Sequence, residues 1–376
     1  MSNCFIRVPL TLLFLYLSGC ASLIEAPNPT FIQEILQHQN NQAQEPVDIL
    51  ALSSDLKIFV DKNIDRSWSS SRRLIALREI LFSAEYFDLQ YETGRTKTAT
   101  ETYEARSGNC LSMTSLFIAM ARYSGLDANY HIVDTIPQWD TSGNTLILTR
   151  HINSVGRLRN GDSYILDFLP NLRRHHDTAS TVSDDYALAI YYNNLAAEAI
   201  IDKRHHAAIN FLMRALELEP KMTDVWNNMG ILQQRLKRLD LAEASFKQAF
   251  ILDKYNHAAA SNLSKLYLKT DKEEKADRLL KRVTRYRERN PYYRYASARI
   301  AYANQNYASA LEELVKAIRI KKNEIVFFEL LSQIHSKLGN QQKEVDSLKI
   351  VAYLDSKKPK TRSSLEIRHP GSFTID

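Results

Sequence analysis

The chain carries three residues whose types together perform nucleophilic catalysis: Cys110, followed by His151 and Asp167. A cysteine attacks a carbonyl as its thiolate, which requires a base to take the proton and a further group to orient that base. Cys110 stands where the polar residues 106–109 give way to the largely apolar run 111–123, so we expect it to begin a helix. The N–H groups and dipole of a helix N-terminus lower the pKa of a thiol and can bind an oxyanion. The alternative is a cysteine that only packs in the core.

The elements that must position these residues can be read from hydrophobic spacing. Apolar residues recur every three or four positions over 48–64 and 71–82, which predicts two amphipathic helices. A short helix capped by Thr98 or Thr100 is expected before Cys110.

Three runs rich in β-branched and aromatic residues follow the helix of Cys110, over 128–135, 145–155 and 163–169. Gly, Pro, Asn and Asp residues bound these runs, as they bound strands in many folds. We expect three antiparallel strands that pack on the helix of Cys110 and so form an α+β unit.

The turn between the last two runs decides whether His151 and Asp167 share a face of the sheet. A two-residue turn at Asn160 and Gly161 would pair residues whose numbers sum to 321 and would place the two side chains on opposite faces. A loop of odd length, such as 159–161 with Gly161 in a bulge, gives a sum of 320 and makes them diagonal neighbours. A catalytic His–Asp pair therefore predicts an odd loop.

The other polar residues of this region indicate no metal site. His131 is interpreted as structural, and the adjacent histidines at 175–176 and 205–206 have side chains that diverge. No clustered acidic pattern typical of calcium binding is present, so we expect neither a metal nor a cofactor. Asn109 and Trp139 are candidates for a side-chain oxyanion donor.

The N-terminus predicts export and lipid attachment. Its apolar run, 8–17, is too short to span a bilayer, which needs about 20 apolar residues, and is typical of a cleaved signal. Residues 17–20, "LSGC", resemble the lipobox of bacterial lipoproteins, in which the cysteine, here Cys20, is acylated and begins the mature chain. The alternative is a simple secretory signal. Ala21, in place of an aspartate, favours the outer membrane, so we expect an anchored protein of the bacterial envelope that faces the periplasm.

The cysteine count makes Cys110 the only thiol of the mature chain. Cys4 leaves with the signal and Cys20 carries lipid through its sulfur, so an intramolecular disulfide is excluded. A single free thiol in an exported protein is a liability unless it is buried or used.

The charge of the chain gives little reason to expect a nucleic-acid partner. The 49 basic and 43 acidic residues leave a net charge of +6, with both signs interleaved. The densest basic stretch, 269–289, holds nine Lys and Arg against five Asp and Glu at spacings that favour the outside of helices. An anionic partner such as lipid headgroups or an envelope polymer is the alternative interpretation of that stretch.

From residue 184 onward, strand patterns give way to a repeat of 34 residues. Small residues recur at one position of the repeat, and larger ones at another: Ala208, Ala242, Ala276 and Ala310, then Leu212, Phe246, Leu280 and Leu314. The pattern resembles the tetratricopeptide repeat, whose small residues let two antiparallel helices approach while bulky residues fill the space between repeats. We expect four clear repeats and a degenerate fifth over 183–356, followed by a loose tail over 357–376.

The stretches "TATETYEARSGNC", "RHINSV" and "YILDF" resemble the transglutaminase-like superfamily of cysteine hydrolases. The resemblance covers residues 47–174 and implies a papain-like core in which Cys110 is the nucleophile, His151 the general base and acid, and Asp167 the orienting carboxylate. Many active members have an aromatic residue shortly after the histidine, where 152–153 is Ile-Asn here. Some bacterial members carry tetratricopeptide repeats behind the core, in the order found here.

We therefore expect an α+β transglutaminase-like domain over 47–182, with helices and a small antiparallel sheet, and an all-α repeat solenoid behind it. A signal peptide (1–19) and a lipidated tether (20–46) with one short helix around 31–36 precede it. The expected function is an envelope-anchored cysteine hydrolase or acyltransferase that acts on peptide or amide bonds through a thioacyl intermediate. The repeats would bind a protein partner or substrate. The alternative is a non-catalytic adaptor, because degenerate members of the superfamily act as binding modules.

Overall fold

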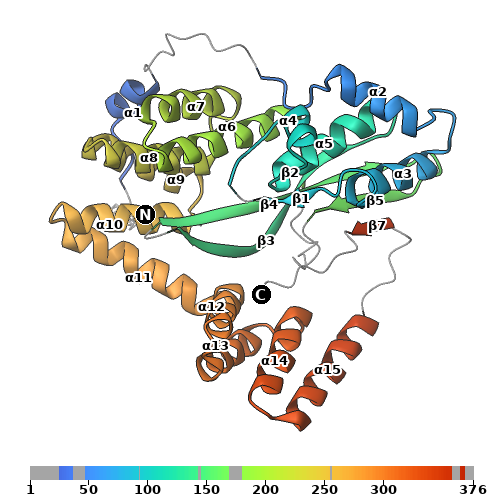
Figure 1. Ribbon diagram of the computed structural model, residues 1–376. Helices are drawn as coiled ribbons and strands as arrows, with labels where there is room; N and C mark the ends of the chain where they lie inside the picture. Colours follow the sequence, from blue (N-terminus) through green and yellow to red (C-terminus); the bar gives the residue numbers. More distant parts are fainter. Residues whose placement is uncertain are drawn as a thin grey trace, which may run out of the picture.

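The computed structural model describes residues 25–36, 47–92, 94–142, 145–168, 180–254, 256–357 and 365–368. Within these ranges, it describes only the backbone of 133–142, 145–151, 287 and 365–368. Cys20 and the side chains of Trp139 and His151 therefore lie outside the described part of the chain. Figure 1 shows the helices of the N-terminal domain on one side of a twisted sheet, and a series of helix pairs that follows them along the chain.

The helices of the N-terminal domain begin at side-chain caps. They are α2 (Ser54–Asn63), α3 (Ser70–Phe82), α4 (Ala99–Ala105) and α5 (Cys110–Tyr123). Thr98 caps α4 and forms a capping box with Glu101, which confirms one of the two expected caps. The helix expected over 48–64 begins only at Ser54. The side chain of Ser53 accepts a hydrogen bond from a backbone N–H in the first turn of α2 and thereby caps its N-terminus.

The three expected strands are β3 (Asn129–Ser142), β4 (Thr145–Arg157) and β5 (Ser163–Asp167), and they pair antiparallel as predicted. Two further strands extend the sheet to the order β6-β3-β4-β5-β7: β6 (Ser180–Val182) and β7 (Leu365–Arg368). The expectation of a loose tail is wrong for β7, because the free edge of β5 pairs with it in parallel. A separate parallel pair joins β1 (Gln90–Tyr91) to β2 (Ser107–Gly108), directly before α5.

Helix α5 forms the centre of the N-terminal domain, and every residue from Leu111 to Ala121 is buried. The hydroxyls of Ser115 and Tyr130 lie 2.7 Å apart and join α5 to β3. The rings of Phe117 and Tyr164 meet edge to face, with centroids 6.1 Å apart, and join α5 to β5. These contacts fix which face of the sheet lies against α5.

The C-terminal part consists of five antiparallel helix pairs, as the repeat predicts. The pairs are α6 (Asp184–Ile201) and α7 (His205–Leu218), α8 (Thr223–Arg235) and α9 (Leu239–Leu252), α10 (His257–Lys269) and α11 (Glu273–Arg289), α12 (Pro291–Ala303) and α13 (Tyr307–Ile320), α14 (Ile325–Lys337) and α15 (Gln341–Ser356). The four alanines of the 34-residue period are fully buried. Small residues at this position let the paired helices approach closely.

The third repeat departs from the period at its bulky position. Leu212, Phe246 and Leu314 are fully buried, whereas Leu280 is 36% exposed and its neighbour Leu279 is buried instead. Helix α11 is also three residues longer than α9 and α13. The second helix of the third repeat therefore packs differently from its counterparts in the other repeats.

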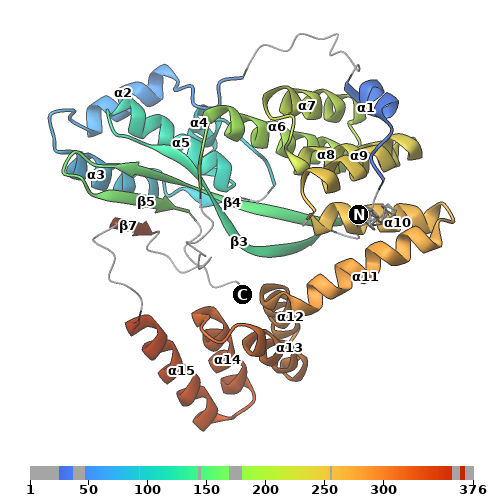
Figure 2. The same ribbon diagram turned by 180° about the vertical axis from the view of Figure 1, so that it is seen from behind.

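The buried hydrophobic residues form two clusters rather than one. Among the described residues, the first runs from the N-terminal domain through α11, and the second lies within α12–α14. Figure 2 shows the same division, with α12–α15 below the sheet and away from α6–α9. The last two repeats thus have a core of their own.

A half-buried acidic residue, Glu243, joins α9 to the N-cap of α11. Its carboxylate lies 2.9 Å from the Lys247 ammonium and 2.7 Å from that of Lys272. Burial raises the pKa of Glu243, but hydrogen bonds from the two lysines outweigh it, so the pKa lies below its ordinary value of 4.5. Because folding lowers the pKa of this carboxyl group, its negative charge stabilises the folded state above pH 4.5. This contribution is lost as the pH falls below 4.5.

We expect Glu243→Gln to lower the free energy of unfolding at pH 7 by about 1–2 kcal/mol, because it leaves two lysine ammoniums without their carboxylate. Urea unfolding at several pH values measures this. The deficit should shrink as the pH falls below 4.5, because protonation of the wild-type carboxylate removes the same negative charge. Glu312→Gln is the control, because Glu312 pairs with Lys316 at an exposed site and its loss should cost less than about 0.5 kcal/mol. An equal loss in both variants would contradict the account.

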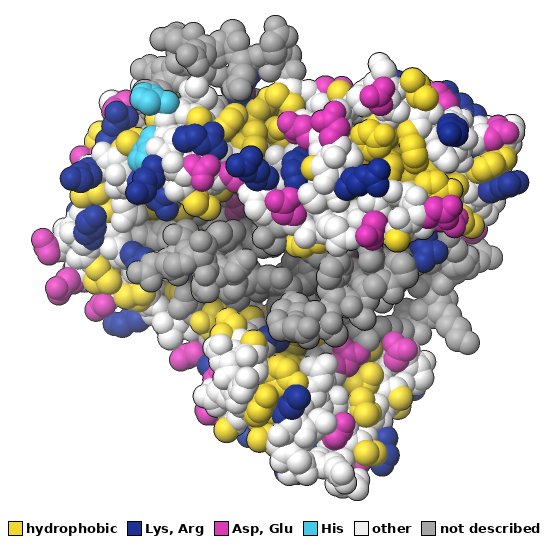
Figure 3. Space-filling model, in the orientation of Figure 1, with side chains coloured by type: hydrophobic (Ala, Val, Ile, Leu, Met, Phe, Trp, Pro, Cys, Tyr) yellow, Lys and Arg dark blue, Asp and Glu magenta, His cyan; other side chains and the backbone are white. Residues whose placement is uncertain are grey.

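Within the described residues, no helix is both long and apolar enough to cross a membrane. Figure 3 shows basic and acidic side chains interspersed over the visible face of the N-terminal domain and the first repeats.

Candidate functional site

The structure places Cys110 at the first residue of α5, as predicted, with its side chain partly buried. Asn109 caps the helix: its side-chain oxygen accepts a hydrogen bond of 3.0 Å from the Ser112 N–H. The Asn109 amide in turn donates to the Thr96 hydroxyl at 2.9 Å. The Asn109 side chain therefore holds the start of α5 in place, and backbone N–H groups of the first turn are better placed than this amide to bind an oxyanion.

Two further contacts fix the approach to Cys110. The backbone N–H of Lys97 donates to the Ser112 hydroxyl at 2.8 Å, so the 94–98 segment lies against the first turn of α5. A Cβ added at Gly108 would lie 2.7 Å from the Ser112 Cβ. A glycine is needed at 108 because the chain itself passes so close to α5.

The strand register confirms the odd loop that a His–Asp pair requires. Ser154 pairs with Leu166 and Arg157 with Ser163, so the numbers of each pair sum to 320. The loop has five residues, 158–162, closed by a hydrogen bond of 2.8 Å from the Leu158 N–H to the Asp162 carbonyl. Gly161 adopts a φ of +91°, which suits glycine. The loop is longer than the three-residue example, but its parity is the predicted one.

A buried row of polar side chains crosses β3, β4 and β5. Asp167 and Asn153 are fully buried, and the Asn153 amide donates to the Asp167 carboxylate at 3.3 Å. The Asn153 oxygen lies 2.9 Å from Nδ1 of His131. His131 was expected to be structural. Its contact with Asn153 places it in the same polar row as Asp167, and no spacing in the sequence indicates this arrangement.

The predicted triad stays a prediction, because the side chain of His151 lies outside the described part of the chain. His151 precedes Asn153 by two residues in β4, and its backbone pairs with that of Val133 in β3. Asn153 and Asp167 lie on the face of the sheet opposite to Tyr130 and Tyr164, which contact α5. The polar row and the tyrosines that contact α5 therefore lie on opposite faces of the sheet.

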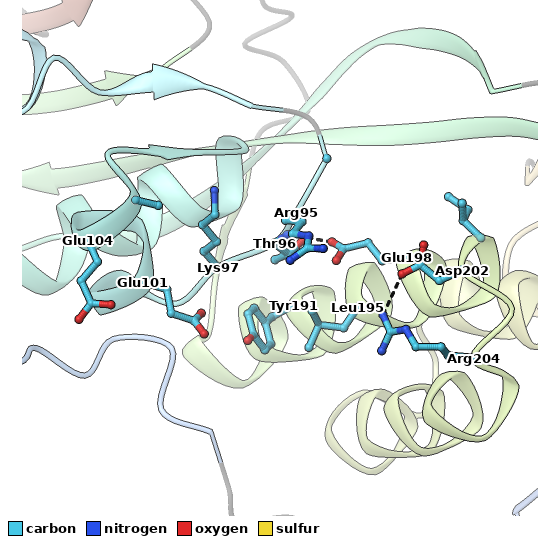
Figure 4. A pocket seen from close by; sticks show the side chains of 13 residues that line it. Arg95, Thr96, Lys97, Glu101, Glu104, Tyr191, Leu195, Glu198, Asp202 and Arg204 are labelled. Carbon is cyan, nitrogen blue, oxygen red and sulfur yellow. Dashed lines mark hydrogen bonds and ion pairs between the residues drawn. The ribbon is translucent and has the colours of Figure 1, made fainter.

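A cleft of about 880 Å³ lies beside the start of α5, between the 94–97 segment, α4 and α6. Figure 4 shows side chains of both signs that line it from the two domains. The Thr96 N–H donates to the Glu198 carboxylate at 2.8 Å, while the Thr96 hydroxyl binds Asn109, next to Cys110. Burial raises the pKa of Glu198. The first repeat helix is thus connected, through Thr96, to the cap of the Cys110 helix.

Comparisons with known proteins agree with this architecture. A family model of the transglutaminase-like superfamily matches residues 66–160, and two tetratricopeptide-repeat models match 189–222 and 236–300. A search of curated proteins found no match.

Solved structures that are similar to the chain include two proteins of low identity. YrrB, a tetratricopeptide-repeat protein with an unusual peptide-binding site, is 17% identical, with 45% of this chain and 88% of that one covered at a TM-score of 0.25. MamA from Desulfovibrio magneticus RS-1 is 16% identical, with 47% and 98% covered at a TM-score of 0.26. The chain thus contains a transglutaminase-like domain, matched over 66–160, followed by tetratricopeptide repeats, matched within 189–300.

Proposed function

We propose that the chain is a lipid-anchored protein of the bacterial envelope whose Cys110 thiolate attacks peptide or amide bonds. The observation that carries the proposal is the odd register of β4 and β5, which brings Asp167 to the face of Asn153, two residues from His151. The position of Cys110 at a helix N-terminus, where a thiolate is stabilised, adds support.

In the proposed reaction, His151 takes the proton of Cys110, and the thiolate adds to the carbonyl carbon. The oxyanion is bound by N–H groups at the start of α5. The C–N bond then breaks, the amine leaves with the proton from His151, and a thioester remains on Cys110. Water resolves the thioester in hydrolysis, and an amine resolves it in transfer. Asp167 orients His151 and stabilises its charged form.

The repeats would bind a protein or peptide partner. Amide side chains bridge the first helices of successive repeats: Asn228 donates to Asn193 and Asn262 donates to Asn227, each at 2.9 Å. These asparagines lie on α6, α8 and α10, and the partly buried ones, Asn193, Asn228 and Asn262, can exchange hydrogen bonds with a peptide backbone. Peptides bind such surfaces through their main chain as well as their side chains.

The adaptor is the second candidate, and Asn153 favours it. This residue stands where many active relatives have an aromatic residue, and it already binds one oxygen of Asp167. Complementation separates the two candidates. The enzyme predicts that Cys110→Ala abolishes function in a strain that lacks the wild-type chain while capture of the partner persists; the adaptor predicts that both persist.

The anchor is tested by Cys20→Ser. We expect the wild-type chain to sediment with membranes and to gain the mass of acyl chains, because several acyl chains hold a protein far more firmly than one. The variant should lose those acyl chains and leave the membrane fraction. Intact-mass measurement of both chains checks this, with Cys110→Ser as the matched control that stays anchored. An acylated Cys20→Ser chain would contradict the assignment.

A further inference from the structure

The second helix of the third repeat carries a stripe of basic side chains. Its buried face is formed by small and apolar residues, Ala276, Leu279 and Val283. With 100° per residue, the cations fall within one third of the helix circumference, turned away from that buried face. We call them the basic stripe: Lys275, Arg278, Lys281, Arg282, Arg285 and Arg289.

Most of the basic stripe is accessible. Lys281, Arg285 and Arg289 are exposed, and the side chain of Arg278 is 53% exposed with a single weak ion pair, at 4.0 Å, to Glu274. The acidic residues of α11 lie in its first two turns and at its end, which leaves 278–286 free of negative charge. An amphipathic helix of this composition is typical of an anionic binding surface.

The N-terminal segment of the chain passes beside this stripe. The short helix α1 (Pro29–Leu36), expected around 31–36, packs on α9 and buries Ile35 to 3% exposure. The Glu25 carboxylate lies 3.7 Å from the Lys275 ammonium, at the first turn of α11. Figure 1 and Figure 2 both show the chain before α1 running from α10 and α11 towards α9.

The lipidation candidate is close to this point along the chain. Cys20 precedes Glu25 by five residues, which span at most about 18 Å when fully extended. If Cys20 is anchored, the bilayer surface lies within that reach of Lys275. Anionic headgroups attract basic side chains over about a Debye length, about 8 Å at physiological ionic strength.

We propose that the basic stripe binds anionic phospholipid headgroups of the bilayer in which Cys20 is anchored. The inference rests on the proposed lipid anchor and adds an orientation to it. The exposed face of α11 lies on the membrane, and the asparagines of α6, α8 and α10 face away from it. The partner surface of the repeats therefore stays accessible from the periplasm.

The test uses the mature chain with Cys20→Ser, which has no acyl group, and vesicles of either phosphatidylglycerol with phosphatidylcholine or phosphatidylcholine alone. We expect binding to the anionic vesicles only, weakened by salt. Arg278→Glu with Arg285→Glu should weaken it at least about 25-fold, because each cation near an anionic surface contributes roughly a five-fold factor. Lys343→Glu with Lys349→Glu is the matched control, with the same change of net charge at exposed positions of α15.

Equal weakening by the two double variants, or equal binding to neutral vesicles, would overturn the proposal. Binding to a soluble acidic polysaccharide but not to anionic vesicles would assign the stripe to an envelope polymer and would overturn it too. Circular dichroism melting confirms that both double variants fold. The proposed anchor is tested separately: it fails if the wild-type chain carries no acyl mass on Cys20. The proposal for the basic stripe fails if the two double variants bind anionic vesicles equally.

Discussion

Cys110→Ala is expected to abolish acylation of the protein by an activated ester while leaving its fold intact. With 4-nitrophenyl acetate, the wild-type chain should gain one acetyl group at Cys110 and release 4-nitrophenolate in a burst. The variant should react at least about 10³-fold more slowly, because removal of a nucleophile leaves only the background reaction. Intact-mass and stopped-flow absorbance measurements check the two signals.

The thermal midpoint of Cys110→Ala should stay close to that of the wild-type chain. Cys110 is only partly buried, so truncation of its side chain leaves little cavity. Asp167→Asn provides the second arm: it keeps a hydrogen-bond acceptor for Asn153 but removes the negative charge that, in the proposed triad, orients His151. We expect slower acylation with Cys110 still present. Unchanged acylation in both variants would assign the reaction to another residue and contradict the proposed nucleophile.

Phe246→Ala is expected to cause the largest loss of stability, about 3–5 kcal/mol. Phe246 is fully buried, and its ring packs so tightly on Gly230 that a Cβ added at Gly230 would lie 2.5 Å from it. The ring therefore fills the space between α8 and α9 completely, and its removal leaves a cavity that the helices cannot close. Urea unfolding followed by circular dichroism measures the loss.

Leu280→Ala is the matched control, because Leu280 occupies the same repeat position one repeat later. Its side chain is 36% exposed, so we expect a loss below about 1 kcal/mol. Equal losses at the two positions would mean that the packing of the second and third repeats is equivalent. That result would contradict the irregularity of the third repeat.

The elements closest to the site could be predicted from local sequence. The change from polar to apolar residues at Cys110 marked a helix start, and the start is capped by Asn109. The parity of the β4–β5 loop followed from the chemistry alone, because a shared face requires an odd number of residues. The repeats followed from their period, since four buried alanines at equal spacing leave few other architectures.

Contacts between distant segments could not be predicted in this way. Thr96 and Glu198 are 102 residues apart, and no pattern in either segment indicates their hydrogen bond. The pairing of β7 with β5 depends on a free strand edge that exists only after the sheet has formed. The burial of Leu279 in place of Leu280 depends on how α11 packs against its neighbours, which the 34-residue period does not indicate. Exact domain boundaries stay predictions for the same reason.

The activation of Cys110 by His151 is the central claim, and the rate of thiol alkylation against pH tests it most directly. Iodoacetamide labelling, followed by intact mass from pH 5 to pH 9, compares the wild-type chain with His151→Ala. Because an imidazolium and a helix N-terminus both stabilise the thiolate, the wild-type chain should react at pH 6 at least about ten-fold faster than the variant. Equal rates at pH 6, both no faster than that of a free thiol, would contradict the account.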